Sequence, residues 1–143
     1  MAKKIIKLSF LIILVPLAVI LGVVVFKDRS YAWVSLCVVL FSLVPLFLTF
    51  EKKDTNTTKL VILAVMIALS VAGRFLFSFI PHFKPVTAMV VITGIYMGYE
   101  YGFICGAFTA LISNFIFGQG PWTPFQMFAW GLIGLLAGLL AKV

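Results

Sequence analysis

The chain has 143 residues, of which 64% are hydrophobic and only 10% are charged. Soluble domains are about half apolar and about a quarter charged, so this composition excludes a soluble enzyme, a nucleic-acid-binding domain, a disordered tail and a disulfide scaffold. The net charge is +7, from eleven Lys and Arg against four Asp and Glu. Most of these cations lie in short segments between long apolar runs, as membrane topology signals do. The sequence therefore predicts an all-α integral membrane protein, surrounded by the lipid bilayer and without a nucleic-acid partner.

Two apolar runs in the first 50 residues are each long enough to cross a bilayer, which takes about 20 helical residues. They are Ile5 to Phe26 and Ala32 to Phe50. The first follows two lysines, as in a signal peptide, but it is long for one, and no small-x-small cleavage site precedes Lys27. We therefore expect a retained helix with a kink at Pro16.

The stretch from Glu51 to Lys59 is the only clearly polar part of the chain. It is therefore the one candidate boundary between structural units. It divides the sequence into two N-terminal transmembrane helices with a cytoplasmic linker (1–58) and a second unit of four helices (59–143).

The second unit contains a segment, Val86 to Phe117, that is too long for one helix. Its natural break is Gly98 to Gly102, which holds two glycines, two tyrosines and Glu100. The helix before the break would be about 18 Å long, so it must be bent or buried among longer neighbours. The four expected helices are Leu60–Ile80, Val86–Met97, Phe103–Phe117 and Phe125–Ala141.

Six crossings place both ends of this polytopic helical bundle on one side of the membrane. With the N-terminus inside, seven cations lie on the inner side and four on or near the outer side. The positive-inside rule therefore predicts cytoplasmic N- and C-termini, and loops 81–85 and 118–124 then face outward. The inner cations are Lys3, Lys4, Lys7, Lys52, Lys53, Lys59 and Lys142, and the outer ones are Lys27, Arg29, Arg74 and Lys84.

Two sets of residues repeat every four positions in the run from Leu60 to Ile80. The sets are Ala64, Ala68 and Ala72, and Ser70, Arg74 and Ser78. The two-residue offset between them is about 200° around a helix, so the sets lie on opposite faces. The alanines form a flat ridge on which another helix can dock closely. Ordinary packing within the bundle is the alternative interpretation of both sets.

Arg74 lies inside an apolar run, about 21 Å along the helix from Leu60 and thus in the outer part of the bilayer. An intramembrane arginine is costly and usually faces protein or a water-filled cavity. The alternative is that its side chain snorkels to the outer headgroups. No acidic residue in the outer half is an obvious partner, because Asp28 would lie at the rim. An anionic or strongly polar group of a ligand would fill that role.

Small residues line the last two helices. The first stripe is Gly102, Gly106 and Ala110, continued by Asn114, and the second is Gly131, Gly134 and Gly138. Small residues at this spacing indicate close helix packing. Asn114, near the outer end, is also positioned to hydrogen-bond a ligand.

The outer loop 118–124 and the residues after it combine a rigid backbone with aromatic rings and amide groups. Two glycines and two prolines favour a rigid turn. Binding pockets combine such aromatic walls with a few polar groups, whereas an interfacial aromatic belt is the alternative. The rings belong to Trp122, Phe125, Phe128 and Trp130, and the hydrogen-bonding groups to Gln119, Thr123 and Gln126.

The sequence contains no nucleophile–base pair, phosphate-binding glycine loop or carboxylate pair, so we expect neither enzymatic activity nor a cofactor. His82 is the only histidine, which excludes a His-based metal cluster within this chain. Cys37 and Cys105 lie inside apolar runs and are expected to be free thiols.

These motifs give the stretch Leu60–Leu140 a resemblance to the substrate-binding S components of energy-coupling factor (ECF) vitamin transporters. The alanine repeat is common in membrane proteins, whereas the Gly118–Pro124 string is much more specific. The motifs are Ala64-x-x-x-Ala68-x-x-x-Ala72, Gly73-Arg74-Phe75, Lys84-Pro85-Val86-Thr87-Ala88 and Gly118-Gln119-Gly120-Pro121-Trp122-Thr123-Pro124-Phe125-Gln126-Met127.

The resemblance implies a six-helix protein of the bacterial plasma membrane that binds a vitamin or vitamin precursor from the outside. It also implies that the alanine ridge (Ala64, Ala68 and Ala72) docks on a transmembrane coupling subunit driven by two ATPase subunits. Toppling of the S component in the membrane would carry the ligand inward. The members that look closest are linked to cobalamin or its precursors. The residues expected to line the pocket are Arg74, Lys84, Asn114, Gln119, Trp122 and Gln126.

Two departures from the family pattern affect this interpretation. The family core has six helices, but only four follow Leu60 here, and two precede it. We expect a C-terminally truncated core, the alternative being that the helices of Ile5–Phe50 fill the missing places. Two hypotheses of function therefore stand. In the first, the chain is a substrate-binding transporter subunit. In the second, it has no small-molecule ligand and is a membrane interaction or assembly protein, or a non-functional fragment.

Overall fold

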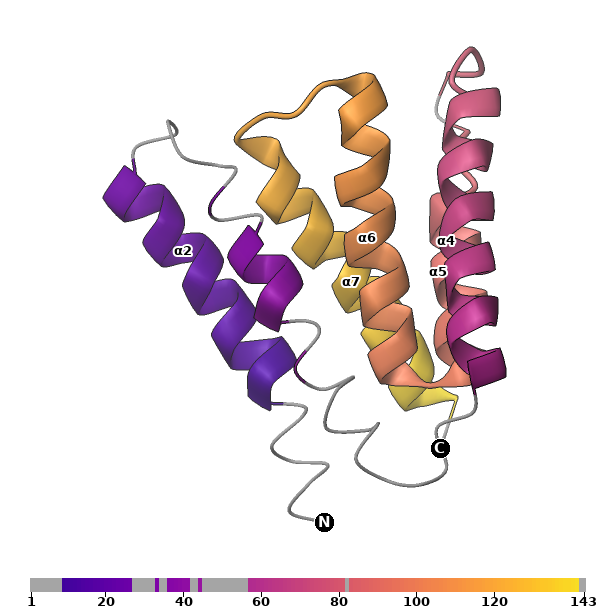
Figure 1. Cartoon of the computed structure of the whole chain (residues 1–143), viewed down its shortest axis with the longest axis horizontal. Coiled ribbons are helices and arrows are strands. Elements are labelled where there is room, and N and C mark those ends of the chain that lie inside the picture. Colours follow the sequence, from indigo (N-terminus) through magenta and orange to yellow (C-terminus); the bar gives the residue numbers. More distant parts are fainter. Residues whose placement is uncertain are drawn as a thin grey trace.

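The computed structural model describes residues 9–26, 33, 36–41, 44, 57–81 and 83–141. All regular structure in these residues is helical (Figure 1), which confirms the predicted all-α class. The elements are η1 (Phe10–Leu14), α2 (Val15–Phe26), α4 (Thr57–Leu76), α5 (Val86–Met97), α6 (Tyr99–Phe117) and α7 (Trp122–Leu140). Residues 36–41 are also helical. The predictions for residues 1–8, for His82, for Lys142 and for most of the segment 27–56 lie outside the described residues.

Three of the described helices, α4, α6 and α7, are long and apolar enough to cross a membrane. α2 contributes a shorter apolar helix, and α5 has only 12 residues, or about 18 Å. The short α5 was expected from the sequence with these same bounds. It packs against α4, α6 and α7, so one face is buried among longer neighbours, as predicted, whereas Ile92, Ile95 and Tyr96 on the other face are exposed.

The helices are arranged around a central pair, α6 and α7. Figure 1 shows α4 and α5 on one side of this pair and α2 on the other. One buried cluster joins Val15 and Val38 of the N-terminal part to Phe103, Met127 and Leu135 of α6 and α7. A second, which includes Leu63, Val86, Val90, Tyr101 and Ile104, lies where α4, α5 and α6 meet.

The first apolar run changes geometry next to Pro16 rather than simply bending. Residues Phe10–Leu14 form a π-helical turn, and the α-helix begins at Val15. Proline has no N–H to donate to the preceding turn, and wide π turns are one way in which a helix adapts to such a missing bond. The predicted disturbance is therefore present, as a π turn before the proline.

α4 ends at Leu76, four residues before the predicted end at Ile80. The backbone N–H groups of Ser78 and Ile80 donate to carbonyl groups three residues earlier, so the chain tightens into turns ahead of Pro81, which cannot continue a helix. The predicted polar face of this helix, formed by Ser70, Arg74 and Ser78, is therefore wrong in its last residue. Ser78 lies beyond the helix and is exposed, whereas Ser70 is buried and Arg74 is half-buried.

Two other boundaries differ from the prediction. The break between α5 and α6 is Gly98 alone, with φ 110° and ψ 165°, a conformation essentially restricted to glycine. Tyr99 to Gly102 therefore belong to α6 rather than to a loop. α7 begins at Trp122 instead of Phe125, because Pro121 precedes its first turn with a helix-compatible φ of −58°.

Glycines bring the backbones of α5, α6 and α7 into direct contact. A Cβ atom on Gly94 or Gly102 would lie only 2.3 or 2.5 Å from the carbonyl oxygen of Gly134, and one on Gly138 would lie 2.4 Å from the nitrogen of Tyr99. Such approaches are possible only where no side chain intervenes. The packing role predicted for these glycine stripes is confirmed.

Candidate substrate-binding site

Polar side chains of α4, α6 and α7 meet at one end of the bundle. α4 and α6 both end there and α7 begins there, at the top of Figure 1. Arg74 is in the last turn of α4, Asn114 is near the end of α6, and Gln126 is in the second turn of α7. The alignment of these helix ends therefore gathers three residues that are far apart in the sequence.

Arg74 reaches from α4 to α6. Its Nη1 donates to Ser113 Oγ and, at 2.9 Å, to Asn114 Oδ1. The side chain therefore contacts protein. The snorkelling alternative required it to extend away from the bundle, and is excluded. The only acidic residue described, Glu100, lies fourteen residues before Asn114, about 21 Å along α6. Within the described part of the chain, the guanidinium is thus held by neutral oxygens rather than by a carboxylate.

Asn114 is the centre of the polar network. Its Nδ2 donates to Thr123 Oγ1 at 3.0 Å and to Gln126 Oε1 at 2.8 Å. The backbone N–H of Gly120 also donates to Thr123 Oγ1, at 3.3 Å. A continuous chain of hydrogen bonds therefore links α4, through α6, to the loop before α7 and to α7 itself. We call this chain the Arg74 network; its side chains are Arg74, Ser113, Asn114, Thr123 and Gln126.

Two aromatic rings flank the guanidinium. Arg74 Cζ lies 4.7 Å from the ring centroid of Phe117 and 5.0 Å from that of Trp130. Each distance is within the range of a cation–π interaction, which contributes about 0.5–2 kcal/mol depending on desolvation. The site thus combines a positive charge, flat apolar surfaces and amide groups.

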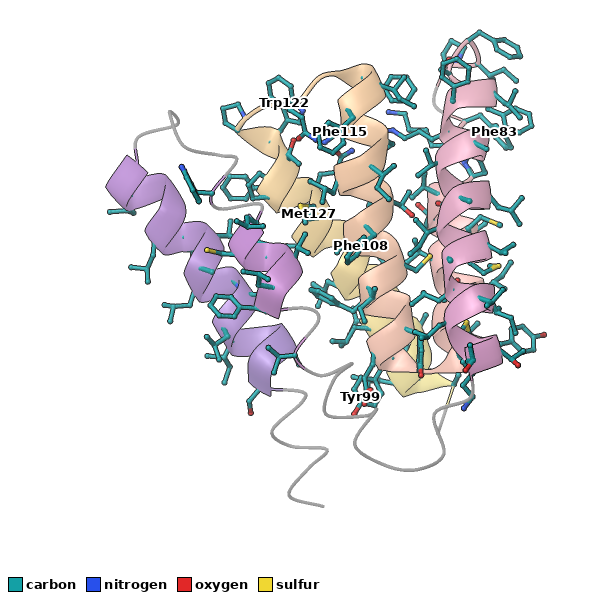
Figure 2. All side chains as sticks on the ribbon, viewed as in Figure 1. Phe83, Tyr99, Phe108, Phe115, Trp122 and Met127 are labelled. Atoms are coloured by element: carbon teal, nitrogen blue, oxygen red, sulfur yellow. The ribbon has the colours of Figure 1, made fainter. Side chains whose placement is uncertain are left out.

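The structure brings together half of the predicted pocket residues. Arg74, Asn114 and Gln126 form the network, but the other three predicted residues do not join it. Gln119 Nε2 donates to the backbone carbonyl of Leu111 at 3.0 Å. Trp122, at the start of α7 (Figure 2), is 57% exposed. Lys84 is exposed in the segment before α5.

Four further residues belong to the cluster and were absent from the predicted set. Ser113 and Thr123 are fully buried and bond the network directly, and Phe117 and Trp130 supply the rings. The signal for Ser113 is its place beside Asn114 in an apolar helix. Thr123 and Trp130 carried the general signals of a polar loop and an aromatic surface, but their partners depend on how α7 is rotated.

Polar groups continue one turn deeper between α4 and α6. Ser70 precedes Arg74 by four residues, and Thr109 precedes Ser113 by four, so each lies on the same helix face as the residue that follows it. Both are fully buried, and neither side-chain oxygen has a hydrogen-bond partner in the described part of the protein. The interface below Arg74 is thus less completely hydrogen-bonded than the network itself.

The predicted docking ridge lies on the opposite side of α4. Ala64, Ala68 and Ala72 are all exposed, whereas Leu63 and Ser70 are buried against the bundle. The two faces inferred from the two-residue offset are therefore separate in the structure. Whether a partner docks on the alanine face remains a prediction.

The comparisons with known proteins identify the family of this chain. The family model described as the ECF-type riboflavin transporter S component matches residues 54–143, which is more than half of the chain. The chain belongs to this family. No curated protein and no solved structure matches significantly. The matched residues include the whole Arg74 network and the alanine ridge, whereas α2 precedes them. This S component is therefore a membrane-embedded, substrate-binding subunit of a vitamin-type transporter, as the sequence resemblance implied.

Proposed function

We propose that this S component captures a riboflavin-like vitamin from outside the cell at the Arg74 network. The family that matches is described by riboflavin, so the sequence-based expectation of a cobalamin-related substrate gains no support. The observation that carries the proposal is the environment of Arg74. A cation without a carboxylate partner in the described residues lies between two aromatic rings and beside amide groups, which suits a flat ring system that bears polar atoms.

The chemistry of the cluster fits such a ligand in two respects. Aromatic walls bind flat conjugated rings through stacking and apolar burial. Directed polar groups then fix the orientation of the ring and distinguish it from other apolar molecules. Phe117, which is exposed, and Trp130, which is half-buried, provide the rings beside the network, and Arg74 and Gln126 provide the polar groups.

Delivery of the vitamin requires the partners of the family. We propose that Ala64, Ala68 and Ala72 dock on a transmembrane coupling subunit in the cell membrane, and that two ATPase subunits bound to that coupling subunit supply the energy. The support is that this face of α4 is exposed and flat while the polar network occupies the other face. Ligand capture and docking therefore use different sides of one helix.

The test is the binding of riboflavin to the purified full-length protein in mild detergent. Flavin fluorescence is quenched when the ring stacks on aromatic side chains, so a titration gives Kd directly. We expect saturable quenching, no comparable binding of cobalamin, and at least a tenfold weaker Kd in Arg74→Ala. The matched control is Lys59→Ala, which removes a cation from the exposed other end of the same helix and should bind as the unmodified protein does.

The alternative function, an interaction or assembly protein, predicts a different result. In that case Arg74 only joins α4 to α6, and the unmodified protein binds no flavin. Arg74→Ala would then lower the unfolding temperature without any change in ligand binding. Purification from native membranes adds a second readout, because recovery of a coupling subunit with two ATPases supports the transporter assembly.

A further inference from the structure

The donor-only chemistry of arginine determines the orientation of every amide in the network. A guanidinium has five N–H donors and no acceptor, so the Asn114 atom that faces Arg74 at 2.9 Å must be the oxygen Oδ1. The amide nitrogen Nδ2 then points to α7. Because this nitrogen donates, the Gln126 atom at 2.8 Å must be the oxygen Oε1.

It follows that the amide nitrogen of Gln126 points away from the network. With Oε1 bound to Asn114, the two N–H groups of Nε2 lie on the other side of the amide, and no described residue accepts from them. Gln126 is only partly buried. Arg74 is also only partly buried, and its hydrogen bonds to Ser113 and Asn114 both use Nη1. Both ends of the network thus present unused donors.

Unused donors beside a cation that has no carboxylate partner among the described residues select one kind of ligand group. A carbonyl oxygen, an unprotonated ring nitrogen or an anion accepts these hydrogen bonds, whereas a protonated amine or another cation meets repulsion and leaves the donors unpaired. We infer that the substrate presents a hydrogen-bond acceptor to this site and that Gln126 Nε2 is the donor that selects it. This inference rests on the proposed function for the identity of the vitamin, but the polarity follows from the network alone.

The critical variant is Gln126→Glu in the full-length protein, with riboflavin as the probe. A glutamate has nearly the same shape, and one carboxylate oxygen still accepts from Asn114, so the network and the unfolding temperature should be retained. The second oxygen replaces the Nε2 donor with an acceptor. We expect riboflavin affinity to fall at least tenfold, equivalent to about 1.4 kcal/mol. Affinity within twofold of the unmodified protein, or tighter, would overturn the inference.

Two further variants separate donor loss from charge and folding effects. Ser78→Glu adds a negative charge at the same end of α4, on an exposed residue outside the network, and should leave riboflavin affinity unchanged. Gln126→Met removes the donor without adding charge, so it should weaken binding several-fold even if the glutamate variant does not fold. Unchanged affinity in the methionine variant would show that Nε2 makes no contact with the ligand.

A pair of small probes tests the polarity independently of riboflavin. Benzoate has an aromatic ring and only acceptors, whereas benzylammonium has the same ring and only donors. At millimolar concentration, benzoate should raise the unfolding temperature of the unmodified protein but not of Gln126→Glu, and benzylammonium should not raise it. The reverse preference would overturn the inference. Absence of riboflavin binding together with benzoate stabilisation would reject the proposed vitamin but retain the acceptor-selective site.

Discussion

Gly134→Ala tests the backbone contact between α6 and α7, on which the position of Asn114 relative to Gln126 depends. The new Cβ atom would lie 2.2 Å from the carbonyl oxygen of Gly102, 2.4 Å from its carbonyl carbon and 2.8 Å from Val90 Cγ1. The two closest obstacles are backbone atoms, so no change of rotamer relieves them. Since Cβ atoms essentially never approach other atoms within 3.0 Å, the helices must separate locally by at least 0.8 Å, the difference between 3.0 and 2.2 Å.

The energetic cost follows from this displacement. A gap of about 0.5–1 Å forfeits a quarter to a half of each van der Waals contact across the interface. Overpacking costs typically about 1–3 kcal/mol, and we expect the upper end of that range because the obstacle is backbone. A loss of about 3 kcal/mol corresponds to a fall in Tm of roughly 10 °C for a chain of this size.

The assay is thermal unfolding of the purified protein in one detergent, with Gly73→Ala as the matched control. Gly73 is also helical, but a Cβ there meets only atoms of the Pro85 side chain, the nearest at 2.8 Å. That nearest atom is the ring Cγ, which a change of ring pucker moves without moving the backbone, and alanine favours the helix by about 1 kcal/mol over glycine, so Tm should change little. An unchanged or higher Tm in Gly134→Ala would refute the direct backbone contact between α6 and α7.

Three further substitutions probe the site, the proposed docking face and a helix junction. Ala68→Leu should abolish co-purification of the coupling subunit while riboflavin affinity stays the same, and loss of both would mean that the alanine face is part of the fold. Arg74→Lys should keep the charge, and one ammonium nitrogen can still donate to Ser113 and Asn114, but it loses the planar guanidinium beside Phe117 and Trp130 and the remaining N–H donors. A titration should therefore show riboflavin affinity several-fold weaker than in the unmodified protein but stronger than in Arg74→Ala. Gly98→Ala should lower the free energy of unfolding by about 1–3 kcal/mol, because the φ and ψ of Gly98 are essentially restricted to glycine. Steric overlap does not contribute, since nothing lies within 4 Å of the new Cβ atom. Unfolding at the temperature of the unmodified protein would contradict this conformation.

Three of the six residues predicted for the pocket meet in the structure, and the sequence singled them out because burying them in an apolar helix is costly. Arg74, Asn114 and Gln126 are polar groups within apolar segments, and such residues are retained only where other groups bind them. Gln119 and Trp122 lie in the specific outer loop, but a loop residue has many possible partners. Gln119 bonds the carbonyl of Leu111, and no sequence pattern distinguishes this contact from one with a ligand.

Composition and periodicity were enough to predict the membrane class, the described helices and the opposite faces of α4. These properties depend on local composition and on helical periodicity, which act within one segment. The sequence also indicated close packing at the glycines, because small residues at this spacing allow two helix backbones to approach each other. Among the described residues, helix ends were misplaced at Ser78, at Tyr99 to Gly102 and at Trp122, because a few residues next to proline or glycine decide between helix and turn.

Which polar groups meet, and in which direction their hydrogen bonds run, follows only from the packing of the helices. That outcome depends on the parallel course of α4 and α6 and on the rotation of α7, which the close glycine contacts hold in place. Arg74 could have extended outward or turned inward, and the groups opposite its guanidinium, the oxygens of Ser113 and Asn114 and two aromatic rings, favour the second. Once the arginine is held there, its lack of an acceptor orients Asn114 and then Gln126, so the polarity of the site is a property of the assembled bundle.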